Sequence, residues 1–379
     1  MSTPDLSVAG GQRLVIAGGG VAAVEALLAA RALAPEGGPE ILLIAADPSL
    51  RLPPHAALKP FARGHADPLP LAEVLADHDG HFVHARIATV DPRRHVVVLD
   101  DGREVAYDEL LVAVGGVPVK GTDRGTGFEL ASPEVVAGVA ADLELGWARS
   151  AAVVVPDGPT WPLPAYEIAL QLAEHAAPAG GAVHLFIPDE EPLSLFGARA
   201  SGEVRALLAD AGVKLYTDER LRVVRTGLVE RDHLRPPVKV DRILSMPRIV
   251  GPAIPGLPLN DAGFIEVDAH GRVAGLTQVH AAGDGTSLPY KFGGLACQQA
   301  DAAVADILAD LGHPVERAPL DPVFDARLVA GDRELVLHHD PSGADRRAPD
   351  WSGGAKIAGR YLTDYVAVKG IAHLAHRGQ

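Results

Sequence analysis

The sequence contains a single cysteine, Cys297, among 379 residues. One cysteine cannot form an intramolecular disulfide or a CxxC redox pair, so chemistry based on paired thiols within the chain is excluded. The sixteen histidines form no HExxH motif. We interpret His338 and His339 as the solvated end of a strand, and the sequence therefore predicts no metal site.

Long apolar runs are also missing, since no uncharged stretch reaches the ~18 residues typical of a membrane span. The N-terminus has no basic segment, and its first apolar run is short and ends in glycines, so we interpret that run as a strand and expect a cytoplasmic protein. The formal net charge of −15 disfavours nucleic-acid partners and broad docking on anionic lipid. Weak local contact with a membrane stays open.

The length suggests two or three domains, and the composition, 47% apolar and 22% charged, is that of a globular protein. Residues 13–47 have the pattern of one βαβ unit. Continuous apolar runs predict strands at 13–17 and 40–45, and an Ala/Leu-rich segment predicts a helix at 21–33. Short strand-like segments between residues 81 and 114 are typical of a β-meander.

A second α/β unit follows, then a return to the first. We expect strands at 151–155, 183–187 and 213–216, with helices at 166–175 and 200–211. The turn-rich segment 248–263 predicts a connection back to the first unit, which strands at 264–267 and 278–281 and a helix at 295–311 would complete. A strand at 334–338 and an amphipathic segment at 357–375 end the chain.

This order predicts an α/β fold with two Rossmann-like dinucleotide-binding domains, a β-meander and a small C-terminal region. The first domain is discontinuous and takes residues 1–123 and 248–312. Residues 124–247 form the second domain, and residues 313–379 form the C-terminal region.

The first strand runs directly into a glycine loop, Gly18-Gly19-Gly20-Val21-Ala22-Ala23, which fits G-x-G-x-x-A and opens a helix. Gly18 permits the tight turn, Gly20 lets a pyrophosphate approach the backbone, and Ala23 lets helix and strand pack closely. Free amides and the helix dipole would hold the anion. Asp47, after the second strand, is the candidate acid for the adenosine ribose.

Two further segments resemble those of flavoproteins with two dinucleotide domains. Residues 107–115 (YDELLVAVG) resemble their "YDxLLxAxG" segment, and residues 279–284 (VHAAGD) resemble "VxAAGD". The resemblance implies bound FAD, with Ala113, Gly115, Gly283 and Asp284 among its contacts. It also implies that the helix beginning near Gly294 points its N-terminus at the flavin, with the charge of Lys291 beside it.

Over residues 13–312 the order of features is similar to that of the pyridine nucleotide-disulfide oxidoreductase superfamily. Residues 160–167 (TWPLPAYE) and 291–296 (KFGGLA) look like bacterial homologues of sulfide:quinone oxidoreductase, with type II NADH dehydrogenases as the next relatives. His55 and Lys59 follow the second strand, where family members line the flavin pocket. They could protonate or orient a substrate, or lie on the surface. Cys297 could attack the flavin, or be a small buried residue.

The sequence departs from this family at three points. The second βαβ turn, residues 156–164, has four prolines and one glycine, which removes amide donors and argues against ordinary NAD(P)H binding. It would form a stiff apolar wall, beside the flavin or at the surface. The paired cysteines that carry sulfur in sulfide:quinone oxidoreductases are absent, and the arginine usual near Pro53-Pro54 is missing.

The leading hypothesis is an FAD-dependent oxidoreductase that passes electrons from an unidentified small-molecule donor to a quinone or similar acceptor. An NAD(P)H-dependent reductase with atypical nicotinamide binding and a non-catalytic FAD-binding module are the alternatives. Aromatic and basic residues of the C-terminal segment would suit a lipid interface. A helix packed on the flavin domain, or at a homodimer interface, is favoured instead.

Overall fold

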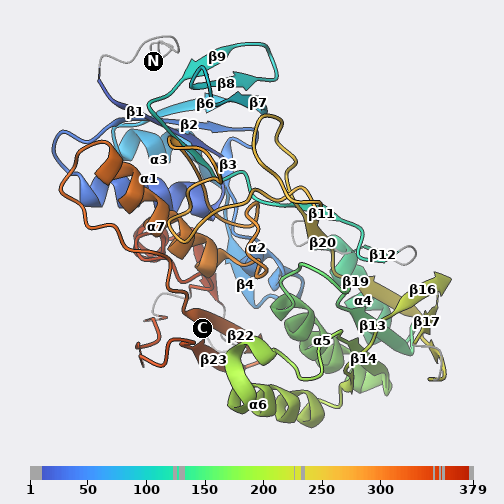
Figure 1. Ribbon diagram of the computed structural model, residues 1–379. Helices are drawn as coiled ribbons and strands as arrows, with labels where there is room; N and C mark the ends of the chain where they lie inside the picture. The colour runs from blue at the N-terminus through green and yellow to red at the C-terminus, as the bar shows by residue number, and fades with distance from the viewer. Residues whose placement is uncertain are drawn as a thin grey trace.

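We describe the protein from a computed structural model, which covers residues 11–122, 126–127, 133–225, 227–231, 235–344, 346–349, 351 and 355–374. Two five-stranded sheets, each entirely parallel, form the frame (Figure 1). The first has the order β21 (Val279–Ala281), β10 (Glu109–Val112), β1 (Arg13–Ala17), β2 (Glu40–Ala45), β6 (His81–His84). The second has the order β12 (Thr126–Gly127), β19 (Arg242–Ser245), β13 (Ser150–Val154), β14 (Ala182–Phe186), β15 (Lys214–Tyr216). The predicted α/β class with two Rossmann-like units is confirmed.

The first sheet is buried on both faces because residues of β1 alternate between two cores. Leu14 and Ile16 pack with three helices, α1 (Val21–Leu33), α3 (Leu71–Asp77) and α7 (Gly293–Asp310). Val15 and Ala17 pack toward the antiparallel strands β7 (Ile87–Asp91), β8 (Val96–Leu99) and β9 (Glu104–Ala106). Alanines along α1 and α7 let these helices pack closely side by side.

The predicted meander between residues 81 and 114 is therefore only partly correct. Its three middle strands form the antiparallel meander, but its first and last strands, β6 and β10, pair in parallel with β2 and β1. Sequence runs of similar length could not reveal this, because the direction of pairing is set by the crossover connections and not by the strand composition.

The second sheet repeats this arrangement. Helices α4 (Glu134–Glu144), α5 (Leu163–Ala176) and α6 (Gly197–Asp210) cover one face. The small antiparallel sheet of β16 (Arg222–Arg225), β17 (Leu228–Glu230) and β18 (Val238–Lys239) covers the other. The two halves are joined by the antiparallel pair β11 (Val117–Val119) and β20 (Arg248–Val250) (Figure 1).

The short elements after β2 bring the chain toward the second half. They are β3 (Ser49–Leu50), α2 (Pro53–Ala56), the 3-10 turn η1 (Lys59–Phe61), β4 (Gly64–Ala66) and β5 (Leu69–Pro70). Two further 3-10 turns, η2 (Ala177–Ala179) and η3 (Ser194–Phe196), lie in the second half. None of the helices within the described part of the chain has the length and apolar character that crossing a bilayer requires.

The C-terminal region packs on both halves. A hairpin of β22 (Phe324–Ala330) and β23 (Arg333–His339) joins the core around α5. Sequence analysis found only the second of these strands. The predicted amphipathic segment 357–375 is broken, because Gly370, with φ +64, ends helix α8 (Leu362–Lys369) and the chain continues as β24 (Ala372–Leu374). Helix α8 packs on α1, and the Tyr365 hydroxyl donates to Asp77 at 2.8 Å.

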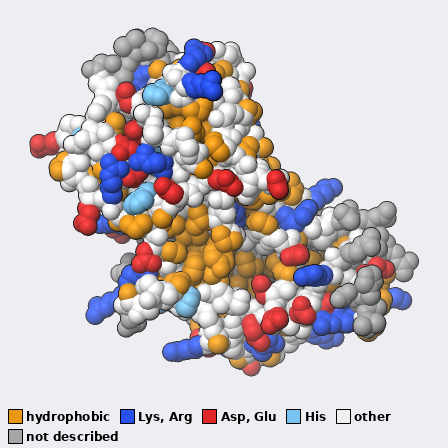
Figure 2. All heavy atoms as spheres, in the orientation of Figure 1, with side chains coloured by type: hydrophobic (Ala, Val, Ile, Leu, Met, Phe, Trp, Pro, Cys, Tyr) orange, Lys and Arg blue, Asp and Glu red, His pale blue; other side chains and the backbone are white. Residues whose placement is uncertain are grey.

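The strand predicted at 264–267 is also wrong. Ile265 and Val267 form only isolated bridges with three different partner segments, so no continuous ladder develops. The surrounding chain, residues 251–278, consists mainly of turns and packs against the antiparallel strands β7, β8 and β9. Figure 2 shows hydrophobic side chains gathered on the face between the upper and lower parts of the molecule.

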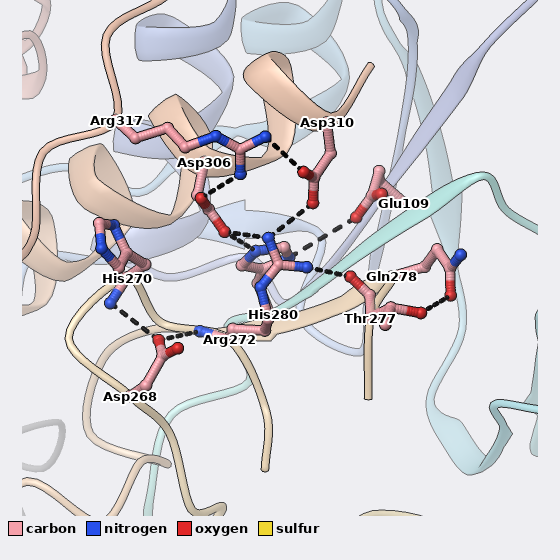
Figure 3. A network of polar contacts seen from close by, with 10 residues as sticks. All are labelled: Glu109, Asp268, His270, Arg272, Thr277, Gln278, His280, Asp306, Asp310 and Arg317. Atoms are coloured by element: carbon pink, nitrogen blue, oxygen red, sulfur yellow. Dashed lines mark hydrogen bonds and ion pairs between the residues drawn. The ribbon is translucent and has the colours of Figure 1, made fainter. Parts of the chain in front are cut away.

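A buried polar network joins α7 to the first sheet (Figure 3). Asp306 accepts a hydrogen bond from His280 Nε2 at 2.9 Å and contacts the guanidinium groups of Arg272 and Arg317. Both arginines also bind Asp310, each at 2.6 Å. Although one histidine and two carboxylates converge here, the arginines already compensate the carboxylates. We therefore interpret the cluster as a cross-link and not as a metal site.

Two further buried atoms, His280 Nδ1 and Glu109 Oε2, indicate where one proton of this network lies. Because His280 Nε2 donates to Asp306, its Nδ1 carries a lone pair, and this lone pair faces Glu109 Oε2 at 3.6 Å. Neither atom has a hydrogen-bond partner among the described residues. Burial, together with carboxylates that include Asp310 and Asp306, raises the pKa of Glu109 to about 8 against the opposing charge of Arg272. A proton on Glu109 would supply the donor that both atoms lack.

This arrangement predicts a pH-dependent difference between the wild type and Glu109→Gln. The stabilisation from a raised carboxyl pKa is complete below the unfolded value of 4.5 and is lost as the pH rises to about 8. Urea unfolding at pH 5 and pH 9 should show the wild type losing on the order of 2 kcal/mol more than the glutamine variant. Equal losses in both proteins would show that Glu109 ionises normally.

Candidate cofactor and substrate site

The glycine loop lies where β1 ends against β10. The Gly18 amide donates to the Ile44 carbonyl at 2.8 Å, and Gly18 has φ +135. A Cβ at Gly18 would lie 2.0 Å from the Ala113 carbonyl oxygen, so only glycine fits there. A Cβ at Gly20, the N-cap of α1, would meet no atom within 4 Å, so the backbone here faces open space.

That open space is a cavity of about 420 Å³ with a polar character at the glycine loop. It is lined by Gly18, Gly19, Gly20, Ile44, Ala45, Ala46, Asp47, Ser49, Arg51, Ala85, Arg86, Ile87, Val114, Gly115, Val117, Pro252 and Ile254. Amides at a helix N-terminus and two arginines suit a pyrophosphate, and the apolar residues suit a flat aromatic base.

Asp47 lies in this cavity, as the sequence predicted, but its carboxylate is already engaged. It accepts the Ser49 amide at 3.0 Å and Arg51 Nε at 2.7 Å. Burial alone would raise the pKa of Asp47, yet these hydrogen bonds from Arg51 and Ser49 hold it below its usual value. Arg51 and Arg86 were not identified from the sequence, although Arg51 lies four residues after Asp47 and only two before Pro53. An arginine thus lies close to the position where the family arginine is missing.

A second cavity of about 270 Å³ continues from the first and shares Gly20, Arg51, Val114 and Gly115 with it. Its walls come from both halves of the molecule and are largely apolar. The other lining residues are Val21, Ala22, Pro53, Pro54, Ala113, Thr160, Trp161, Met246, Pro247, Ile249, Ala282, Gly283, Asp284, Lys291, Phe292, Gly293, Ala296 and Ile357. An elongated ligand with a charged middle and an apolar ring at one end fits this pair of cavities.

Asp284 is the one carboxylate on this second cavity. Its carboxylate has no hydrogen bond or ion pair with any residue that the structure describes. Burial raises the pKa of Asp284 to about 6, against the opposing charge of Lys291. The half-buried Asp284 carboxylate faces the cavity, where it can accept hydrogen bonds from a ligand, such as the hydroxyl groups of a sugar-alcohol chain.

Lys291 also lines the second cavity, but its ammonium group is held in the wall. Nζ donates to the Thr286 carbonyl at 2.6 Å and lies 4.0 Å from the centre of the Phe264 ring. Burial lowers the pKa of Lys291 to about 8, although Asp284 opposes this shift. The lysine therefore adds a positive charge near the N-terminus of α7, as expected from the sequence.

Several other predicted site residues lie outside both cavities. His55 is buried beneath β4, because the single turn of α2 presents Pro53 and Pro54 to the cavity instead. Lys59 is exposed on η1. Cys297 is fully buried beside Gly359, on another face of α7 than Ala296, and burial raises the pKa of its thiol well above the usual value. These positions do not support the predicted catalytic roles of the three residues.

Two further residues that the sequence predicts to contact the cofactor do not line either of the two cavities. Ala23 is in the core between α1 and the sheet, which is the packing role that its motif predicts. Gly294 lines a small neighbouring space instead of the second cavity, which we call the ring cavity. Gly293 lines the ring cavity itself.

The proline-rich loop after β13 lies beside the second cavity. Trp161 stacks on Phe292, with ring centres 4.4 Å apart and planes inclined by 21°. Phe292 is the N-cap of α7, so this stack joins the second half of the molecule to the helix that points at the cavity. The loop is therefore the apolar wall that its prolines predicted.

Behind this wall lies a buried ion pair that the sequence did not reveal. Lys356 Nζ contacts Glu167 Oε1, which also accepts the Val329 amide at 2.8 Å. Both side chains are 1% exposed. Burial raises the pKa of Glu167 and lowers the pKa of Lys356. The only signal in the sequence was a single acid among the apolar residues of the first half of α5, LPAYEIAL.

Comparison with known proteins agrees with this geometry. The family model described as "Pyridine nucleotide-disulphide oxidoreductase" matches residues 12–306. A search of curated proteins found no match. Among solved structures, the sulfide:quinone oxidoreductase of Aquifex aeolicus has a TM-score of 0.79 and 18% identity, over 94% of this chain and 90% of that one.

Two other similar structures have a TM-score of 0.61. An NAD-dependent persulfide reductase from A. fulgidus is 18% identical and covers 86% of this chain and 63% of that one. A water-forming NADH oxidase from Lactobacillus brevis is 17% identical, over 86% and 74%. At such identities these likenesses show the fold, whereas the family match spans most of the chain. The chain therefore belongs to the pyridine nucleotide-disulphide oxidoreductase family and is an FAD-dependent oxidoreductase.

Proposed function

We propose that FAD lies along the two joined cavities, with its adenosine end in the first and its ring in the second. Gly18, Gly19 and Gly20 would face the pyrophosphate, and Arg51 would add charge there. Asp284 would accept hydrogen bonds from the ribityl chain, since it lacks a partner in the described part of the protein. Bound FAD supplies the two-electron chemistry, and the chain sets its position and surroundings.

We also propose that the enzyme passes electrons from a small-molecule donor through FAD to a quinone or similar apolar acceptor. The observation that carries this proposal is the buried Glu167–Lys356 pair behind an apolar wall of the ring cavity. Pro54, Trp161, Phe292 and other wall residues line both the ring cavity and the small space at the pair. An apolar cavity beside a buried acid–base pair suits quinone reduction, which consumes two protons.

The proton of this pair can lie on either member. Burial raises the carboxyl pKa of Glu167 and lowers the ammonium pKa of Lys356, so the form with the proton on Glu167 is more accessible than it would be in water. Glu167 Oε2 has no hydrogen-bond partner among the described residues, so it has a free position for a proton. The similar fold of a sulfide:quinone oxidoreductase supports the acceptor class.

The first prediction concerns Glu167→Gln, which keeps the shape of the side chain but cannot ionise. After anaerobic photoreduction of the bound flavin, mixing with ubiquinone-1 should restore the oxidised flavin spectrum at least about tenfold more slowly than in the wild type. Stopped-flow absorbance measures this rate, and an unchanged oxidised spectrum shows that the variant folds. Glu73→Gln on α3, an exposed acid remote from the site, serves as the control. A wild-type rate in Glu167→Gln would show that the Glu167–Lys356 pair does not deliver protons to the acceptor.

A second prediction concerns the donor. Prolines 162 and 164 at the start of α5 remove amides that would bind a pyrophosphate. Anaerobic addition of NADH or NADPH should therefore leave the flavin oxidised for minutes, while photoreduction of the same sample bleaches it. Bleaching within seconds of mixing would establish an NAD(P)H-dependent reductase instead.

A further inference from the structure

A third cavity of about 620 Å³ lies on the other side of Trp161, at the carboxyl ends of β13 and β14. Thr160, Trp161 and Lys291 line both this cavity and the ring cavity. In an open parallel sheet, ligands bind at this edge of the strands. The chemistry of its walls shows what kind of ligand it suits.

The cavity offers few donors to an anion. Five of its lining residues are prolines, which carry no amide hydrogen: Pro156, Pro159, Pro162, Pro188 and Pro289. Thr160 already donates its hydroxyl to the Pro247 carbonyl at 2.8 Å, and the ammonium of Lys291 is bound to Thr286. The remaining hydroxyl donors, on Ser194 and Tyr290, carry no positive charge to offset the lost hydration of a phosphate or carboxylate group.

Two carboxylates and three aromatic rings line the same cavity. Asp157 and Asp189 are exposed at the cavity, and neither forms a side-chain hydrogen bond or ion pair with any residue in the described ranges. Burial raises the pKa of Asp189, and the charge of Asp157 raises it further. Trp161, Phe196 and Tyr290 supply ring faces and edges, and Trp161 meets Phe196 edge-on at 6.2 Å. Uncompensated negative charge beside aromatic rings favours a cation.

We infer that this cavity is a binding site for a small organic cation, such as a protonated amine with an apolar body. Its charged end would lie between Asp157 and Asp189, and its apolar body against Trp161 and Phe196. The ligand would therefore contact the wall that this cavity shares with the ring cavity. This inference is independent of the acceptor proposed above, because its charged residues, Asp157 and Asp189, take no part in that proposal.

Three probes of one shape test the charge requirement: benzylamine, benzyl alcohol and benzoate. Calorimetric titration of the FAD-loaded protein should give benzylamine a dissociation constant at least tenfold below that of benzyl alcohol, with no binding of benzoate. Excess NADH should not displace benzylamine. Equal affinity for the amine and the alcohol, no amine binding at millimolar concentration, or displacement by NADH would each overturn the inference.

Matched double variants locate the site. Asp157→Asn with Asp189→Asn should weaken benzylamine binding at least tenfold, to the level of benzyl alcohol. The control, Glu36→Gln with Asp364→Asn, removes the same charge from two exposed positions outside the cavity and should bind as the wild type does. Equal loss in both variants would show only a general charge effect and would contradict the assignment. Reoxidation of the photoreduced variants by ubiquinone-1 should stay unchanged, which separates this site from acceptor reduction.

Discussion

The close approach of two backbones at the end of β1 determines where the cofactor can lie. Gly18 is so near the Ala113 carbonyl that a single Cβ would occupy the space of that oxygen. This contact holds the glycine loop beside Gly115, and the parallel pairing of β10 with β21 places Gly283 and Asp284 at the same edge. These three segments, separated by up to about two-thirds of the chain, thereby meet around one pair of cavities.

The polarity of these joined spaces changes along their length. Amides and arginines lie at the first cavity, one unpaired carboxylate lies midway, and aromatic and proline side chains close the ring end. Trp161 is central to this closed end, since it lines the ring cavity, the small space at Glu167 and the larger cavity of the second half. In this way one stacked side chain separates the cofactor cavity, the buried Glu167–Lys356 pair and a candidate ligand site.

Much of the frame was predictable because its signals are local. The strand, glycine loop and helix at the start of the chain have their expected bounds, since apolar runs and glycines report directly on burial and turn geometry. The site was less predictable where it depends on long-range packing. Glu167 and Lys356 are 189 positions apart, and only the folded C-terminal region brings them together. Likewise, His55 and Cys297 follow correct motifs, but the helices that carry them turn other residues toward the cavity.

We propose that FAD occupies the cavities with Asp284 as an acceptor for its ribityl chain. The most direct measurement is the flavin-to-protein ratio and visible spectrum after incubation with FAD and gel filtration, for the wild type and for Asp284→Ala. We expect close to one flavin per chain in the wild type, with the two visible bands of bound oxidised flavin, and clear loss of flavin from the variant. A wild-type protein that elutes colourless, or a variant that retains FAD as tightly as the wild type, would contradict it.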